Sequence, residues 1–311
     1  MRRTTHVRSK TPSGSKSRMA RFFSMPGNED LADEIAVLTA SETGAIESHQ
    51  FPDGESYVRI RGGAGNGNIF LVCTFACPDR QFLPLVFAAR ALRAAGARSI
   101  SLIAPYLAYM RQDRAFAAGE AVSSRIFADL ISREFDRLIT VDPHLHRIAS
   151  LQDIYSIPAT VVHTSELIGS WVRDHVASPI VLGPDAESTQ WAENIARDAG
   201  CPWAVFRKER TGDREVQLIP PSLDQHRMRT PVLVDDIISS GATMIQAAKI
   251  LIAAEMLPPY CIAVHALCDE STGAEIQGLG QSLLTSDSIP NPHSAFSVAP
   301  LIAEQLAAVA T

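Results

Sequence analysis

The sequence predicts an α/β protein of two similar domains, each built on a mostly parallel sheet flanked by helices. Three observations support this prediction. The chain has 311 residues, which suits two domains of roughly 100–150 residues. From about residue 20 onward, short apolar runs alternate with amphipathic segments, as expected for parallel strands joined by crossover helices. The alternation is interrupted near residues 150–165 and then begins again, which indicates a hinge there.

The first half of the chain carries the first run of alternating elements. Apolar runs predict its strands, and apolar residues at helical spacing predict its helices. Ser123 or Ser124 is expected to cap the second helix, because a serine hydroxyl accepts a hydrogen bond from the first turn. In chain order we expect a strand at 69–75, a helix at 83–97, a strand at 99–107, a helix at 123–135 and a strand at 137–142.

The second half repeats this order. Ser188 is expected to open its first helix and Gly200 to close it, since glycine favours the left-handed conformation that ends helices. In chain order we expect a strand at 179–183, a helix at 188–200, a strand at 202–209, a strand at 231–237, a helix at 241–256, a strand at 260–267 and a final strand and helix within 296–310.

These elements divide the chain into three parts. We expect a disordered basic leader at 1–19, an N-terminal domain at 20–155 and a C-terminal domain at 156–311. One arrangement that this division allows has the last helix packing back on the N-terminal domain. Two similar halves suggest duplication, although no residue-level repeat is visible.

Charge is distributed unevenly along the chain. Residues 1–21 carry seven Lys and Arg side chains and no acid. Removing those seven from the total of 28 leaves 21 basic against 34 acidic residues, a net charge of −13 for the remainder. Such an acidic body is a poor match for nucleic acid, so we expect no nucleic-acid partner. It suits an enzyme that brings in anionic substrates with magnesium and a few local cations.

The basic leader has three interpretations. An export signal is disfavoured because no apolar region follows Arg2 and Arg3. A transit peptide fits the Ser/Thr-rich, acid-free composition, but a disordered leader is the simplest interpretation and the one we favour. No apolar run approaches the roughly 20 residues that would span a bilayer, so we expect no membrane association. Five cysteines without a CxxC pair indicate a reducing compartment, and we expect a cytoplasmic location.

Polar clusters follow four of the predicted strands at their carboxyl ends. In open α/β sheets, ligands bind just beyond those ends. We therefore expect the clusters to meet in one site. They are RQDR after 99–107, DPHLH after 137–142, GPDAES after 179–183 and DDIISSGAT after 231–236.

The segment 231–244 has the pattern of a phosphate-binding loop. A buried strand ends in Asp235 and Asp236, and a turn of small residues at 239–243 leads into a helix. Successive backbone N–H groups at a helix N-terminus favour an anion. Two adjacent carboxylates would repel phosphate, so they suit sugar hydroxyls or a metal cation. The alternative is an ordinary strand–turn–helix with a capping serine.

With these residues the chain resembles the phosphoribosyl diphosphate-binding motif shared by type I phosphoribosyltransferases and ribose-phosphate pyrophosphokinases. The resemblance implies a type I phosphoribosyltransferase-like fold for both domains. It also implies that the acids hold ribose hydroxyls while the loop holds the 5-phosphate. Many members have a third acid where this chain has Ser239, which indicates a variant branch nearer the non-allosteric members. The implied loop contacts are Ser239, Ser240, Gly241, Ala242 and Thr243.

Two further segments decide between these families. FPDGESYVRI (51–60) taken alone predicts a hairpin. APYLAYMRQDR (104–114) places aromatic residues beside arginines, which suits base stacking and phosphate binding, although a salt-bridged loop would look the same. Together they closely resemble the ATP-binding parts of ribose-phosphate pyrophosphokinases, and the motif order matches from about residue 20.

That resemblance implies specific ATP contacts. Phe51, Asp53, Gly54 and Glu55 would contact adenine in the site of a neighbouring subunit, whereas Arg111 and Gln112 would bind the nucleotide in their own subunit. A shared adenine site implies a homo-oligomer, at least a dimer, with a tetramer and a hexamer both open.

The histidines of DPHLH and the acid of GPDAES are candidates for a cation site. His144 and His146 alone are too few for zinc, because no cysteine or third histidine lies nearby in the sequence. The resemblance assigns His144 and Asp185 to magnesium–ATP. Magnesium prefers oxygen ligands, so Asp185 is the more natural direct contact. Family members commonly have glycines after this aspartate, whereas this chain has Ala186 and Glu187.

FRKERTGDREV (206–216) is a charged segment that predicts either a solvated hairpin or a flexible lid. The resemblance implies that Lys208 is the catalytic lysine and that Arg210 lies beside it, acting in catalysis and binding ribose 5-phosphate. Phosphoryl transfer needs mainly alignment and charge neutralisation from the protein, which lysine and arginine can supply.

The sequence therefore predicts an enzyme that transfers pyrophosphate from Mg–ATP to the 1-hydroxyl of ribose 5-phosphate, giving phosphoribosyl pyrophosphate and AMP for nucleotide biosynthesis. A type I phosphoribosyltransferase is one alternative, and a non-catalytic regulatory paralogue of the synthetase is another. The apolar end of the chain differs from the more polar tail of nucleotide-inhibited relatives, so we expect weak or absent inhibition by ADP.

Overall fold

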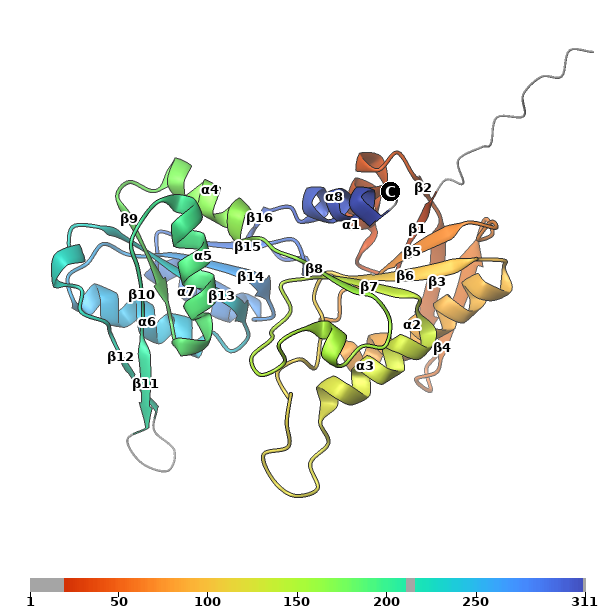
Figure 1. The fold of residues 1–311 in the computed structure, drawn as a ribbon, viewed down its shortest axis with the longest axis horizontal. Helices are drawn as coiled ribbons and strands as arrows, with labels where there is room; N and C mark the ends of the chain where they lie inside the picture. Colours follow the sequence, from red (N-terminus) through yellow and green to blue (C-terminus); the bar gives the residue numbers. More distant parts are fainter. Residues whose placement is uncertain (1–19, 211–215, 310–311) are drawn as a thin grey trace, which may run out of the picture.

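The computed structural model describes residues 20–210 and 216–309, so the predicted leader at 1–19 lies outside the described residues. Two domains lie side by side, each with one six-stranded sheet (Figure 1). Every strand pair within the two sheets is parallel. The predicted fold class, two similar α/β domains, is confirmed.

The first sheet has the strand order β2-β1-β5-β6-β7-β8. Helices α1 and α8 lie over one face in Figure 1, and α2 and α3 lie over the other. The elements of this domain are β1 (Arg21–Ser24), α1 (Glu29–Leu38), β2 (Glu42–Thr43), β5 (Asn68–Val72), α2 (Pro78–Ala94), β6 (Ser99–Ala104), α3 (Ser123–Glu134), β7 (Arg137–Val141) and β8 (Ala159–Val162).

The second sheet has the order β10-β9-β13-β14-β15-β16. Its elements are α4 (Ser165–His175), β9 (Pro179–Gly183), α5 (Thr189–Ala199), β10 (Trp203–Val205), β13 (Thr230–Ile238), α6 (Ala242–Ala253), β14 (Tyr260–Ala266), α7 (Glu270–Leu279), β15 (Ser282–Ser286), β16 (Ser294–Phe296) and α8 (Ala299–Val309). Strand β8 pairs with β7, so the first sheet extends beyond residue 155.

Two antiparallel hairpins form separate two-stranded sheets. Strands β3 (Ala45–Gln50) and β4 (Ser56–Arg61) form the first, around the turn that the sequence predicts. Strands β11 (Arg207–Arg210) and β12 (Val216–Ile219) form the second, which projects from the second domain in Figure 1. The expected strand at 202–209 is therefore two strands, because the chain leaves the sheet at the fully buried Phe206.

Three helix ends test the capping predictions. Gly200 closes α5 in the left-handed conformation with φ +67°, as expected. Ser188 precedes α5, but its hydroxyl donates to the Asp185 carbonyl instead of capping the helix. The predicted cap of α3 is wrong: the helix begins after Val122 without a side-chain cap, and Ser123 Oγ donates to Gln112 Oε1 at 2.5 Å.

A hydrophobic cluster joins the two domains. It includes Leu31 and Ile35 of α1 together with Ile302 and Leu306 of α8, and α8 packs directly against α1. The C-terminal helix thus packs on the N-terminal domain. Among the described residues, no helix is long and apolar enough to cross a bilayer. All five cysteines are free, and Cys73 and Cys261 are buried.

Candidate active site

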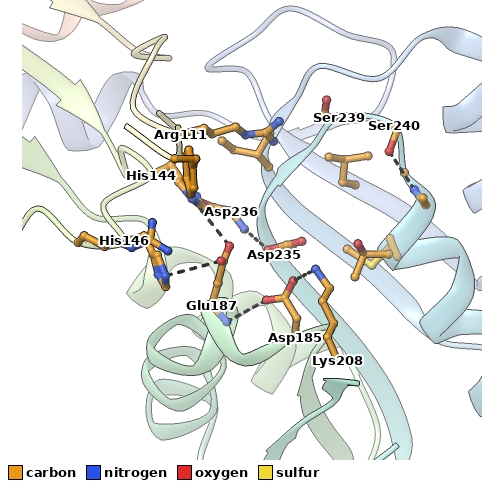
Figure 2. A pocket seen from close by; sticks show the side chains of 18 residues that line it. Arg111, His144, His146, Asp185, Glu187, Lys208, Asp235, Asp236, Ser239 and Ser240 are labelled. Atoms are coloured by element: carbon orange, nitrogen blue, oxygen red, sulfur yellow. Dashed lines mark hydrogen bonds and ion pairs between the residues drawn. The ribbon is translucent and has the colours of Figure 1, made fainter. Parts of the chain in front are cut away.

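A cavity of about 440 Å³ lies where the carboxyl ends of strands from both domains meet (Figure 2). All four predicted polar clusters contribute to its walls, and Arg111 is the residue that the RQDR cluster contributes. The expectation that these clusters converge is met for the following residues: Arg111, His144, Asp185, Asp235, Asp236, Ser239, Ser240, Gly241, Ala242 and Thr243. Lys208, from the charged segment 206–216, lines the same cavity.

The small-residue loop forms one wall of the cavity. It connects β13 to α6, which begins at Ala242. Gly241 is the N-cap residue and has φ +70°, a conformation that glycine adopts without strain. A Cβ at this position would lie 2.4 Å from Thr272 Cγ2, so the turn also requires the absence of a side chain. The loop therefore presents the N-terminus of α6 to the cavity, an arrangement suited to an anion.

The two acids before this loop differ in protonation behaviour. Burial, together with the charges of Asp236 and Asp185, raises the pKa of Asp235 well above its usual range. Burial acts on Asp236 in the same sense, but the hydrogen bond and charge of His144 outweigh it and lower the pKa of Asp236. Asp236 is thus the carboxylate that stays ionised, and Asp235 needs a cation or hydroxyl donors to do so.

His144 makes a contact between the two domains. Its Nδ1 lies 2.6 Å from Asp236 Oδ2, and this hydrogen bond raises the pKa of His144. On the other side of the ring, Nε2 lies 4.0 Å from Glu187 Oε2. Glu187 Oε1 is also 3.7 Å from His146 Nε2, so Glu187 faces both histidines (Figure 2). His144 is therefore oriented by carboxylates from the second domain.

Asp185 is 8% exposed, and backbone N–H groups of the residues that follow it hold its carboxylate in place. Its Oδ1 accepts hydrogen bonds from the N–H groups of Glu187 and Ser188, because Asp185 caps the short helix η2 (Ala186–Ser188). Its Oδ2 accepts from Lys208 Nζ at 2.6 Å (Figure 2). The bulkier residues after Asp185 thus form a capped turn that keeps the carboxylate at the cavity.

Lys208 reaches the cavity from β11 of the second hairpin. The described part of this segment forms an antiparallel strand pair, as the hairpin interpretation expects, and Lys208 pairs across it with Leu218. Arg210 ends β11, and its side chain lies outside the described residues.

Arginines of the first domain form the opposite wall. Arg111 and Arg147 both line the cavity beside Phe116. Arg147 Nη1 donates to Asp113 Oδ1 at 3.0 Å, and its guanidinium lies 5.9 Å from the centre of the Phe116 ring. Asp113 is 7% exposed, so this buried carboxylate anchors Arg147 at the edge of the cavity.

Gln112 does not line the cavity. Its side chain accepts from Ser123, and its carbonyl accepts from the N–H of Ser124 at 3.2 Å. Gln112 therefore holds the start of α3 against the loop that carries Arg111.

The turn of the first hairpin also lies away from this cavity. Phe51 is 44% exposed, and its ring contacts His49 and Tyr57 edge-on. Gly54 has φ +93°, and Glu55 N donates to Asp53 Oδ1 at 3.1 Å, which closes the turn. None of the four predicted adenine contacts lines the cavity of its own chain.

Family models match both domains. The N-terminal domain of ribose phosphate pyrophosphokinase matches residues 20–134, and the phosphoribosyl transferase domain matches residues 150–277. The ribose-phosphate pyrophosphokinase of Methanopyrus kandleri is 34% identical over 278 residues, covering 88% of this chain and 94% of that protein. The chain belongs to the ribose-phosphate pyrophosphokinase family.

Other members of the family agree in length and fold. Ribose-phosphate pyrophosphokinase 2 of Archaeoglobus fulgidus is 30% identical over 291 residues, covering 92% of this chain and all of that protein. The crystal structure of phosphoribosylpyrophosphate synthetase from Mycobacterium smegmatis superposes with a TM-score of 0.82 at 23% identity, covering 94% of this chain and 98% of that chain. This likeness concerns the fold alone.

Phe116 and Arg147 also line this cavity and were not predicted from the sequence. Each lies next to a predicted cluster, since Phe116 follows RQDR and Arg147 follows DPHLH. Their position next to these clusters is the sequence feature that could have identified them as cavity residues. Among the described residues, no group of three or more His, Cys, Asp or Glu side chains is arranged to hold a metal ion.

Proposed function

We propose that this pyrophosphokinase transfers the pyrophosphoryl group of Mg–ATP to the 1-hydroxyl of ribose 5-phosphate within the cavity between its domains. The observation that carries the proposal is the pairing of two walls. A phosphate-type loop and two acids lie on one wall, two arginines lie on the other, and Lys208 lies beside Asp185 in the same cavity. The 1-hydroxyl oxygen bonds to the β-phosphorus and releases its proton to solvent. The bond from the β-phosphorus to the α–β bridging oxygen breaks, and AMP leaves with that oxygen.

The second domain binds the sugar phosphate. The backbone N–H groups of residues 239–243 and the hydroxyls of Ser239, Ser240 and Thr243 hold the 5-phosphate. Asp235 and Asp236 accept hydrogen bonds from the ribose hydroxyls. These contacts suit a sugar phosphate because acids and phosphate donors lie at opposite ends of one short segment.

The first domain binds the nucleotide phosphates. Arg111 lines the cavity with a guanidinium for which no hydrogen bond or ion pair is found among the described residues. Arg147 uses one of its donors on Asp113, and a guanidinium has five, so the remaining donors are free for phosphate oxygens. Gln112 supports Arg111 through the packing of α3.

Magnesium fits the acids of this cavity, since it binds through one or two carboxylates and substrate phosphates. Asp185 would hold it directly, with His144 contacting a phosphate oxygen, and it would neutralise phosphate charge when bound. The Asp185 oxygen that contacts Lys208 faces the cavity and is available to a cation once Lys208 moves.

Lys208 and Arg210 stabilise the charge that develops on the transferred group. Positioned cations of this kind contribute about 10³–10⁵ in rate in other phosphoryl-transfer enzymes. In the part of the chain that the structure describes, the hairpin that carries them pairs with no strand of the six-stranded sheets, and we expect it to move as substrates bind.

The first hairpin serves a neighbouring subunit. Phe51, Asp53, Gly54 and Glu55 lie on an exposed turn outside their own cavity, and an exposed aromatic ring suits adenine. The protein is therefore a homo-oligomer of at least two copies. Free cysteines favour a reducing compartment, so we place it in the cytoplasm.

A product assay tests the function directly. Purified protein is incubated with ATP, ribose 5-phosphate and Mg²⁺, and AMP and phosphoribosyl pyrophosphate are quantified with and without ADP. We expect equal amounts of the two products and little inhibition by ADP. Failure to form AMP, combined with release of pyrophosphate from phosphoribosyl pyrophosphate and a base, would instead identify a phosphoribosyltransferase.

A further inference from the structure

A second histidine contact also joins the two domains. His265 lies on β14 of the second domain and is fully buried. Its Nε2 lies 3.1 Å from the Val141 carbonyl oxygen and 3.3 Å from that of Asp142, both at the end of β7 in the first domain. Its Nδ1 lies 2.8 Å from Ser288 Oγ. Both ring nitrogens are thus occupied, and one of them reaches across the domain boundary.

The protonation of this ring follows from its partners. Carbonyl oxygens only accept hydrogen bonds, so Nε2 carries the proton. Burial lowers the pKa of His265, which favours the neutral ring, and Nδ1 lies 2.8 Å from Ser288 Oγ. The nearby charges of Asp142 and Asp236 act in the opposite sense without reversing the shift. His265 is a neutral, directional bridge and not an ion pair.

The residue that His265 holds leads directly to His144. Asp142 has φ +35°, an uncommon backbone conformation for a residue with a side chain. Its carboxylate accepts from Thr164 N and Thr164 Oγ1, both at 2.8 Å, within its own domain. Its carbonyl accepts from His265 of the other domain. Asp142 is therefore fixed at both ends, and only Pro143 separates it from His144.

Asp236, the partner of His144, lies on β13, which pairs with the strand β14 that carries His265. His265 pairs in register with Ile237, which directly follows Asp236. One histidine from each domain thus contacts the other domain: His144 reaches Asp236, and His265 reaches the residue two positions before His144. Asp142 is two residues from His144, and His265 pairs with the residue after Asp236, so the second contact limits how far the first can open.

We infer that His265 is a positioning residue: it sets the approach of the two domains and thereby places His144 against Asp236 for the reaction. The inference rests on the proposed function, because His144 and Asp236 are taken as site residues. A positioning role for His265 differs from a purely structural role in one respect. Loss of the Nε2 contact disturbs the relation between the nucleotide wall and the sugar wall, while the sugar wall itself stays intact.

A matched pair of variants separates the two ring nitrogens. In His265→Gln the side-chain amide reaches the position of Nε2 and keeps the contact between domains. In His265→Asn the amide reaches the position of Nδ1 and keeps only the Ser288 contact. We expect His265→Asn to lower kcat by about 10- to 100-fold, because displacing reactive groups by about 1 Å costs rate on this scale. His265→Gln should retain most of the activity.

Ribose 5-phosphate binding, measured by titration calorimetry, supplies the second readout. Its contacts lie in the second domain, so both variants should keep an affinity within about twofold of the unmodified protein. Rates are expressed per folded molecule, with the folded fraction taken from circular dichroism. Equal kcat values for His265→Asn and His265→Gln, or a parallel loss of ribose 5-phosphate affinity, would overturn the inference. An unmodified protein that forms no AMP would instead overturn the proposed function.

Discussion

Lys208 Nζ lies 2.6 Å from Asp185 Oδ2, so the lysine proposed for catalysis is paired with the acid proposed for magnesium. The Lys208 side chain is 42% exposed and that of Asp185 is 11% exposed, so the more exposed partner lies on the hairpin. A cation that binds Asp185 competes with Lys208 for the same oxygen. Magnesium binding would therefore release Lys208 toward the phosphates, which couples substrate binding to assembly of the site.

Replacing Lys208 tests this arrangement. We expect Lys208→Ala to lower kcat by about 10²–10⁴-fold, because a positioned charge aimed at the transition state is lost. Ribose 5-phosphate affinity should stay nearly constant, since Lys208 is not among its proposed contacts. Glu209→Ala is the matched control, because neighbouring strand residues point to opposite faces. Near-normal turnover in Lys208→Ala would refute the assignment.

Gly241→Ala should disrupt the phosphate loop for two separable reasons. A left-handed conformation costs a residue with Cβ roughly 1–2 kcal/mol. The new Cβ would also lie 2.4 Å from Thr272 Cγ2. We expect a raised KM for ribose 5-phosphate and a lower free energy of unfolding in urea. The double variant Gly241→Ala, Thr272→Ser removes the clash but not the backbone strain, so it should recover only part of the loss. An unchanged KM in Gly241→Ala would contradict the proposed phosphate site.

The fold followed closely from the sequence because its signals are local. Apolar runs and helical spacing predicted the strands and helices around the site, and the carboxyl-end rule brought Asp185 and Asp236 to one edge. The prediction of a capping serine for α3 was wrong because the Ser123 hydroxyl donates to Gln112 instead. No local sequence pattern encodes this contact. Local propensity is overridden wherever a tertiary partner competes for the same group.

The site geometry was less predictable than its composition. His144 and Asp236 are 92 residues apart in the sequence, and His265 is 123 residues from Asp142. Periodicity and spacing do not determine such contacts, because they depend on how the two domains pack. The anchoring of Arg147 by Asp113 is of the same kind, since it joins two loops that follow different strands.

His163 should make stability depend on pH. Its Nδ1 lies 2.9 Å from Asp142 Oδ1, and this hydrogen bond raises the pKa of His163 despite partial burial. A raised pKa means that the folded state binds the proton more tightly than the unfolded state. The resulting stabilisation is complete below the unfolded pKa of about 6.5 and is lost as pH rises through the raised folded pKa.

The measurement compares the unmodified protein with His163→Gln. The difference in free energy of unfolding should be larger at about pH 5.5 than at about pH 9. His175→Gln serves as the control, because His175 Nδ1 contacts the Trp171 carbonyl oxygen instead of a carboxylate. A difference that grows with rising pH would show that the sign of the pKa shift is wrong.

The exposed turn of the first hairpin gives the most direct test of a shared site. Phe51→Ala should raise the KM for ATP with little effect on stability, because Phe51 is 44% exposed and packs only at the edge of its neighbours. The decisive experiment mixes this variant with Lys208→Ala. In a mixed oligomer, a Phe51→Ala subunit keeps its own Lys208 and receives an intact turn from its neighbour, so that site is complete. Activity of the mixture should therefore exceed the sum of the separate variants, with mixed oligomers verified by native mass spectrometry. Mixed oligomers without any gain would show that the turn does not act on the neighbouring site.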